Sequence, residues 1–249
     1  MMNMTPVVKQ LLIINIIFFI GCELVPAASE YFVLFFPENP GFQAWQPITH
    51  MFMHGNLLHI AFNMFALYSF GSMLEHFWGG KKFLFFYISC GLGAALLNFA
   101  VNYYYYQEGL NILIANGYPK SDILQILNEG KIAVKWKELL TVSQFDNFIH
   151  AYGGVVLGAS GAVYGLLTAF AFMFPNAELA LMFIPIPIKA KYFVPGLLLV
   201  DLFLGLRGNS LFGSGGTGIA HFAHLGGAIA GFLMMLYWKK NQFNNNRWN

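Results

Sequence analysis

Charged side chains are scarce in this sequence. Only 10% of its 249 residues are Asp, Glu, Lys or Arg, against about 25% in an ordinary soluble domain. The formal net charge is +2, which excludes the basic surface of a nucleic-acid-binding protein. The two cysteines, Cys22 and Cys90, both lie in apolar stretches, so neither a disulfide framework nor a thiolate metal site is indicated.

Apolar residues are abundant instead. Hydrophobic side chains make up 57% of the chain, and the mean hydropathy is +0.58. This composition excludes a typical cytosolic enzyme and a disordered chain, and it predicts an all-α polytopic membrane protein. A helix needs about 20 apolar residues to cross about 30 Å of hydrocarbon. Six segments meet this requirement: 8–26, 57–78, 83–106, 153–174, 190–206 and 218–238.

The first segment allows two interpretations. Asn15 and Glu23 interrupt it. A signal peptide is also possible, because Lys9 precedes the apolar run and small residues follow it at 27–29. We retain it as a span because its removal would break the distribution of positive charge. With the N-terminus inside, the inner ends and short inner loops carry eight Lys or Arg residues, and the short outer loops carry only Arg207. Both termini are therefore predicted to be cytoplasmic.

Two further segments are not predicted to cross the membrane. Residues 27–56 contain three prolines and several aromatic residues, which is typical of an interfacial loop. Residues 107–149 have apolar positions at helical spacing and most of the soluble-type residues, so we expect an outward-facing helical hairpin lying on the membrane. The polar tail 241–249 carries no motif. We expect one membrane domain over 1–249.

Polar residues cluster in three predicted spans that run in the same direction. They are His50, His54, His59 and Asn63 around the start of the second, Gly158–Gly161 with Ser160 in the fourth, and His221 and His224 in the sixth. Ser160 lies 15 residues before Pro175, and His224 lies 15 residues before Lys239. Both should therefore lie about 22 Å above the inner boundary, roughly 8 Å below the outer one. Glycine pairs such as Gly154/Gly158, Gly161/Gly165 and Gly227/Gly231 would let the helices approach closely.

Each of these features also has a structural interpretation. A serine in a membrane helix usually hydrogen-bonds its own backbone, and glycine pairs usually serve packing. His50 and His54, four residues apart, could bind a metal ion. However, no carboxylate has the spacing needed to complete a zinc site, and the His-Glu-x-x-His motif is missing from the second span. We therefore expect neither a metal ion nor a cofactor.

Taken together, four motifs resemble those of the rhomboid intramembrane serine proteases. They are Trp45-Gln46-x-x-Thr49-His50, His54-x4-His59-x3-Asn63, Gly158-x-Ser160-Gly161 and Ala223-His224-Leu225-Gly226-Gly227. The resemblance covers the whole six-helix body, with the motifs in the expected order. It implies a rhomboid bundle that cleaves transmembrane protein substrates.

The resemblance also implies a role for individual residues. Ser160 would be the nucleophile and His224 the general base of a Ser–His dyad. His59 and Asn63 would stabilise the oxyanion together with the Ser160 backbone N–H. Tyr164 would pack against the ring of His224, and His54 would support the loop before the second span.

The sequence departs from the family pattern in three places. Gln46 stands where the family often has Arg, His221 is an additional histidine one turn before His224, and the 107–149 insertion is long. Asp201, in the fifth span, is the remaining candidate for a third member of a triad. We expect it to be dispensable because the family acts through a dyad.

The predicted function is intramembrane serine endopeptidase activity, with the lipid bilayer and transmembrane substrates as partners and no obligatory protein partner. An inactive rhomboid-like protein that binds transmembrane clients is the alternative. Such proteins typically lack the catalytic serine, the catalytic histidine or both, whereas this chain has both Ser160 and His224. A transporter would be expected to show inverted repeats and broken helices, and neither is visible. We expect a bacterial inner membrane, because no Arg- and Ser-rich transit segment precedes the first span.

Overall fold

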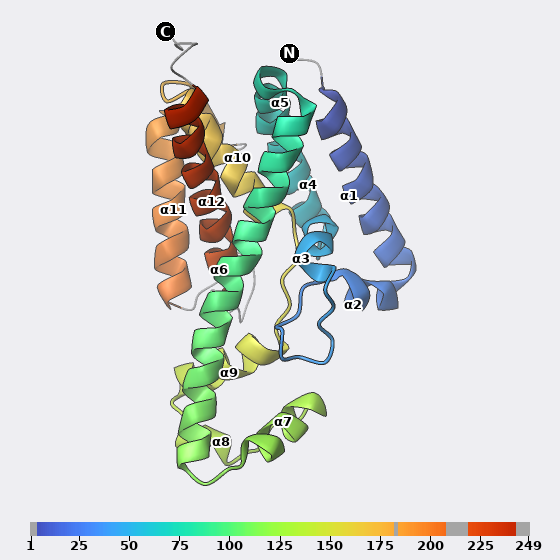
Figure 1. Cartoon of the computed structure of the whole chain (residues 1–249), viewed down its shortest axis with the longest axis vertical. Helices are drawn as coiled ribbons and strands as arrows, with labels where there is room; N and C mark the ends of the chain where they lie inside the picture. Colours follow the sequence, from blue (N-terminus) through green and yellow to red (C-terminus); the bar gives the residue numbers. More distant parts are fainter. Residues whose placement is uncertain (1–3, 182–183, 208–218, 243–249) are drawn as a thin grey trace.

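The computed structural model describes residues 4–181, 184–207 and 219–242. The chain is mostly helical, and its long helices pack side by side (Figure 1). Three of the described helical stretches are long and apolar enough to cross a membrane by length and composition: Pro6–Leu24, Leu57–Trp78 and Gly80–Ala115. The N-terminal end of α1 and the C-terminal end of α12 lie at the same end of the bundle (Figure 1).

The first two predicted spans form as expected. Helix α1 covers Pro6–Leu24, and the second span runs through α4 (Leu57–Ala66), a π-helical turn (Leu67–Gly71) and α5 (Ser72–Trp78). The side chain of Asn56 caps α4 by accepting a hydrogen bond from the His59 backbone N–H at 2.8 Å. The segment between the two spans folds into short helical pieces: Pro26–Ala28, α2 (Ser29–Phe32), α3 (Gln46–Thr49) and His50–Phe52.

Helix α6 is longer than the predicted third span. It covers Gly80–Ala115, 36 residues, because no helix-breaking signal occurs before Gly117 and Pro119. At about 1.5 Å per residue it is roughly 54 Å long, which exceeds about 30 Å of hydrocarbon. Its C-terminal part extends beyond the other long helices, to where the shorter helices that follow it in the chain lie (Figure 1), so the helix continues past the predicted end of the third span at residue 106.

Residues 107–149, predicted as a helical hairpin, contain the end of α6 and several shorter helices. These are α7 (Lys120–Asn128), α8 (Trp136–Leu139) and the start of α9 (Val142–Gly153). Their apolar side chains pack around the C-terminal part of α6 and form a second hydrophobic core, while the contact of this segment with a membrane stays a prediction. Its buried members include Tyr106, Leu110, Leu113, Ile123, Leu127, Trp136, Leu140 and Phe148.

The fourth predicted span begins later than expected. Helix α10 covers only Ser160–Met173, so the predicted start at 153 was wrong. Residues 154–159 are not helical because Gly158 has φ +117°, and Val156 pairs with Leu34 through two backbone hydrogen bonds of 2.9 Å. The Gly154/Gly158 pair is therefore part of an extended segment and not of a helix–helix contact.

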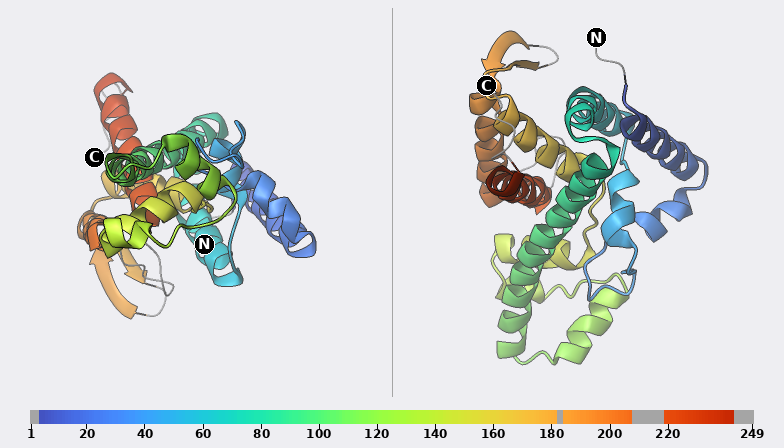
Figure 2. Two further views of the ribbon diagram at one scale, coloured as in Figure 1. Left: turned by 90° about the horizontal axis from the view of Figure 1, so that it is seen from below. Right: turned by 45° about the horizontal axis from the view of Figure 1, so that its top comes forward.

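The remaining elements complete the bundle. An antiparallel hairpin that the sequence did not predict, β1 (Glu178–Leu181) and β2 (Ile184–Lys189), follows α10. It projects from the end of the bundle (Figure 2). Helix α11 covers Ala190–Arg207, and α12 covers Ile219–Gln242 and packs against α6, α10 and α11. These two helices lie close to the predicted fifth and sixth spans.

Glycines bring α6, α10 and α12 into backbone contact. A Cβ atom added at Gly227 would lie 1.9 Å from the carbonyl oxygen of Gly161, and one at Gly231 would lie 2.9 Å from Gly165 Cα. A Cβ at Gly161 itself would lie 2.4 Å from Ala94 Cβ on α6. Only glycine permits these approaches, as in small-residue packing of membrane helices.

We predict that Gly227→Ala lowers the free energy of unfolding by about 3 kcal/mol, because the new methyl group collides with backbone that has no room to move. Gly196→Ala on α11 is the matched control, since no described atom lies within 4 Å of the added Cβ. It should leave the stability unchanged within about 1 kcal/mol. Denaturation in detergent micelles measures both, and equal stability of the two variants would contradict the packing described here.

Glu75 fixes the first helix to the second span. This buried carboxylate on α5 accepts hydrogen bonds from Thr5 Oγ1 at 2.5 Å and from the backbone N–H groups of Val7 and Val8 at 2.9 Å each. Those N–H groups belong to the first turn of α1, where no intrahelical acceptor exists. A negative charge at this end of a helix is also favoured by the helix dipole.

We predict that Glu75→Ala lowers the free energy of unfolding by about 2–4 kcal/mol, because three donors lose a charged acceptor. Glu30→Ala, at an exposed position on α2, should change it by less than about 0.5 kcal/mol. The same micelle denaturation experiment compares them. A Glu75 variant as stable as the Glu30 variant would show that the cap contributes nothing.

Candidate active site

Ser160 is the first residue of α10 and follows an extended approach segment. The positive φ of Gly158 turns the chain, and the Gly158 N–H donates to the His50 carbonyl oxygen at 2.9 Å. The first backbone N–H groups of an α-helix have no intrahelical acceptors, and in α10 no side chain caps them. A helix N-terminus of this kind stabilises negative charge.

His224 lies directly against this serine. Its Nε2 atom is 2.9 Å from Ser160 Oγ, a distance at which the hydroxyl can donate its proton to the imidazole. The Tyr164 ring stacks on the imidazole with 4.3 Å between centroids and 10° between planes. The structure thus brings together the serine and histidine that the sequence placed at equal depth on parallel helices.

Asp201 on α11 contacts the other side of the same imidazole. Its Oδ1 atom is 3.2 Å from His224 Nδ1, and it also accepts a hydrogen bond from His221 Nδ1. The carboxylate is 1% exposed. Asp201 was expected to be dispensable because the family acts through a dyad; the structure places it at hydrogen-bonding distance from the candidate base.

These three residues also form the one group in the described part of the chain that could hold a metal ion. Ligand atoms of Asp201, His221 and His224 all lie within 4.8 Å of one another. A buried carboxylate with two imidazoles is a ligand set that zinc accepts. The hydrogen bonds from His221 Nδ1 and His224 Nδ1 to Asp201 Oδ1 already account for these short distances.

His59 and Asn63 lie on α4 beside the approach to Ser160. A Cβ added at Gly158 would lie 2.7 Å from His59 Nε2 and 3.6 Å from Ser160 Oγ, so both atoms surround this glycine. His59 is also within electrostatic range of His224. The Nδ2 atom of Asn63 is buried without a hydrogen-bond partner among the described residues, and an unsatisfied buried donor is costly unless a ligand uses it.

His50 and His54 support this region from the loop before α4. Burial lowers the pKa of each to about 4, so both imidazoles are neutral at neutral pH. His50 Nδ1 is 3.0 Å from the Gln46 carbonyl oxygen, while the His54 ring packs edge-on against His59 with 5.0 Å between centroids. His50 and His54, considered above as possible metal ligands, are not part of the group formed by Asp201, His221 and His224.

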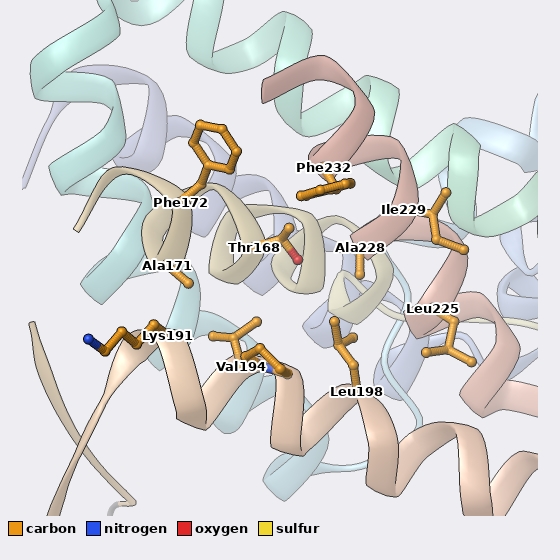
Figure 3. A pocket seen from close by; sticks show the side chains of 11 residues that line it. Thr168, Ala171, Phe172, Lys191, Val194, Leu198, Leu225, Ala228, Ile229 and Phe232 are labelled. Carbon is orange, nitrogen blue, oxygen red and sulfur yellow. The ribbon is translucent and has the colours of Figure 1, made fainter. Parts of the chain in front are cut away.

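An apolar groove of about 400 Å³ lies between α10, α11 and α12 (Figure 3). Apart from Thr168 and Lys191, its lining side chains are apolar, and they include Val194, Leu198, Leu225, Ala228 and Phe232. The Thr168 hydroxyl donates to the Tyr164 carbonyl oxygen at 2.9 Å. The groove lining is therefore almost entirely apolar, and it includes none of the residues clustered around Ser160.

A rhomboid-domain family model matches residues 41–118 and 132–241, which include Ser160, His224, Asp201, His59 and Asn63. The chain belongs to the rhomboid family. Among its relatives, an uncharacterised mitochondrial rhomboid protein of Schizosaccharomyces pombe is 28% identical over 215 residues, covering 79% of this chain and 52% of the relative.

Two other relatives are also mitochondrial rhomboid proteins by name. Rhomboid protein 1 of Saccharomyces cerevisiae is 27% identical over 78% of this chain and 41% of its own length. The presenilin-associated rhomboid-like protein of Homo sapiens is 25% identical over 88% of this chain and 46% of its own length. The match thus spans about half the length of these relatives.

Proposed function

We propose that this rhomboid protein is an intramembrane serine endopeptidase that cleaves transmembrane protein substrates. The observation that carries the proposal is the 2.9 Å contact between His224 Nε2 and Ser160 Oγ at the N-terminus of α10. A serine hydroxyl is a weak nucleophile until an adjacent base accepts its proton. Membership of the rhomboid family supports transmembrane proteins as the substrate class. The distance between the side chains supports Ser160 and His224 as the reacting groups.

The proposed reaction proceeds in two steps. Ser160 Oγ attacks the scissile carbonyl carbon while its proton moves to His224 Nε2, and the resulting tetrahedral intermediate collapses by expelling the amine, which takes that proton. A water molecule then attacks the acyl-enzyme with His224 as the base. The second collapse releases the carboxylic acid and returns the proton to Ser160 Oγ.

His59, Asn63 and the Ser160 backbone N–H would stabilise the negative oxygen of both intermediates. Their placement supports this role, because His59 Nε2 and Ser160 Oγ flank Gly158 and Asn63 Nδ2 has no described partner. Donors held in place before the reaction stabilise the developing charge without a reorganisation cost. The unfilled N–H groups at the start of α10 add the field of the helix N-terminus.

We propose a single membrane domain over 1–249 with six spans and an insertion on the outer side. The shared end of α1 and α12 (Figure 1) supports an even number of crossings. The family match omits 119–131, which contains α7, in keeping with an insertion. Helix α10 has 14 residues and is therefore about 21 Å long, so it starts below the outer surface and leaves water a route to Ser160.

Two observations bear on the membrane in which the protein resides. The charge distribution supports termini on the inner, cytoplasm-like side. The mitochondrial names of the relatives count against the bacterial inner membrane that the sequence analysis expected. The proposed catalytic chemistry is the same in either membrane.

We predict that Ser160→Ala and His224→Ala each abolish cleavage of a model transmembrane substrate by the purified protein in lipid vesicles. Ser72→Ala is the matched control, because this buried serine on α5 lies outside the cluster and should retain full activity. EDTA should also leave the activity intact. A folded wild type that binds the substrate without cutting it would instead indicate an inactive client-binding protein.

We further predict that His59→Ala and Asn63→Ala each reduce kcat by about 100-fold or more, as loss of one oxyanion donor does in soluble hydrolases. KM should change by less than about threefold, because the donors act mainly on the intermediate. Steady-state kinetics on the vesicle-reconstituted variants separates the two constants. Variants that raise KM alone would assign both residues to substrate binding.

A further inference from the structure

We propose that Asp201, held by His221, positions His224 for catalysis, so that this rhomboid protein works through four hydrogen-bonded residues and not through a dyad alone. The inference rests on the proposed function of Ser160 and His224. It starts from the two imidazole contacts made by a single carboxylate oxygen, Asp201 Oδ1.

The first step concerns the tautomer of His224. A neutral imidazole has one N–H donor and one acceptor nitrogen. Nε2 must be the acceptor to receive the proton of Ser160 Oγ, so the hydrogen of the neutral ring must be on Nδ1. That N–H lies 3.2 Å from Asp201 Oδ1, which therefore favours the reactive tautomer and fixes the ring plane.

The second step concerns the charge of Asp201. An ionised carboxylate within a membrane span is costly unless it is paired and hydrogen-bonded. His221, one turn before His224 on α12, donates to the same Oδ1 and is itself buried. The additional histidine thus compensates part of the cost of the carboxylate that supports the base, whose Oδ2 atom has no hydrogen-bond partner among the described residues.

The third step concerns how α11 reaches this position. Gly205 lies one turn after Asp201 on the same helix face, and a Cβ added there would be 3.2 Å from the Phe222 ring and 3.4 Å from His221 Cβ. The missing side chain lets α11 approach α12 at the level of the two histidines. Tyr164 from α10 completes the cluster by stacking on His224.

When the proton of Ser160 moves to Nε2, His224 becomes positively charged. Asp201 then faces a cation across the Nδ1–H hydrogen bond, in surroundings where opposite charges interact more strongly than in water. The carboxylate does not accept the proton; it stabilises the imidazolium and keeps the ring in place.

The test is Asp201→Asn, which keeps the size of the side chain but can present an N–H to Nδ1 and favour the wrong tautomer. We expect kcat to fall by at least 100-fold with KM changed less than threefold; in a soluble triad enzyme the same substitution costs about 10⁴. Labelling of Ser160 by a fluorophosphonate should slow in parallel. His221→Leu should lose more activity than His221→Asn, because asparagine can still donate to Asp201.

Glu75→Gln is the matched control, since it makes the same chemical change at another buried carboxylate in a span. It should destabilise the protein but leave kcat per folded molecule within about threefold. Nitrogen-15 NMR of histidine-labelled protein provides a second readout. The Nδ1–H tautomer of His224 should dominate in the wild type and decrease in Asp201→Asn.

A kcat within tenfold of wild type together with an unchanged tautomer in Asp201→Asn would overturn the inference while leaving the Ser160–His224 chemistry intact. A wild-type protein that neither cleaves nor labels would instead overturn the proposed function. The tautomer measurement would still show in that case whether Asp201 orients His224.

Discussion

The contact between the backbones of α10 and α12 sets the geometry on which the site depends. A Cβ at Gly227 would overlap the carbonyl oxygen of Gly161, so only glycine allows these helices to touch. Ser160 precedes Gly161 on one helix, and His224 precedes Gly227 by one turn on the other. Because both residues adjoin the point of contact, the 2.9 Å distance between their side chains follows from helix packing and does not depend on a flexible loop.

A second constraint is the cost of polar groups in hydrocarbon. Asp201, His221, His224 and Ser160 are linked through a chain of hydrogen bonds, which offsets part of the cost of placing them there. Asn63 Nδ2, both ring nitrogens of His54 and Asp201 Oδ2 have no partner among the described residues. The unpartnered donor of Asn63 matches its proposed role in stabilising the oxyanion.

The sequence predicted much of this arrangement. The helical stretch 57–78 was predicted with the bounds that the structure shows, because it is mostly apolar and Gly79 follows it. The pairing of Ser160 with His224 followed from equal residue counts to the inner boundary. The end of α6, the late start of α10 and the β-hairpin were not predicted, because tertiary packing and the φ of Gly158 decide them. Asp201 was a candidate for a third member of a triad but was expected to be dispensable, because the resemblance implied a dyad. Its contact with His224 depends on how α11 packs against α12, which the sequence pattern does not specify.

The central claim is that His224 activates Ser160 within this helical bundle. The most direct measurement is mass spectrometric mapping of the fluorophosphonate adduct on protein in lipid vesicles, comparing wild type, His224→Ala and Ser72→Ala. The account predicts one adduct, on Ser160, in the wild type and in Ser72→Ala, and none in His224→Ala. An adduct on another residue, or undiminished labelling of Ser160 in His224→Ala, would contradict it.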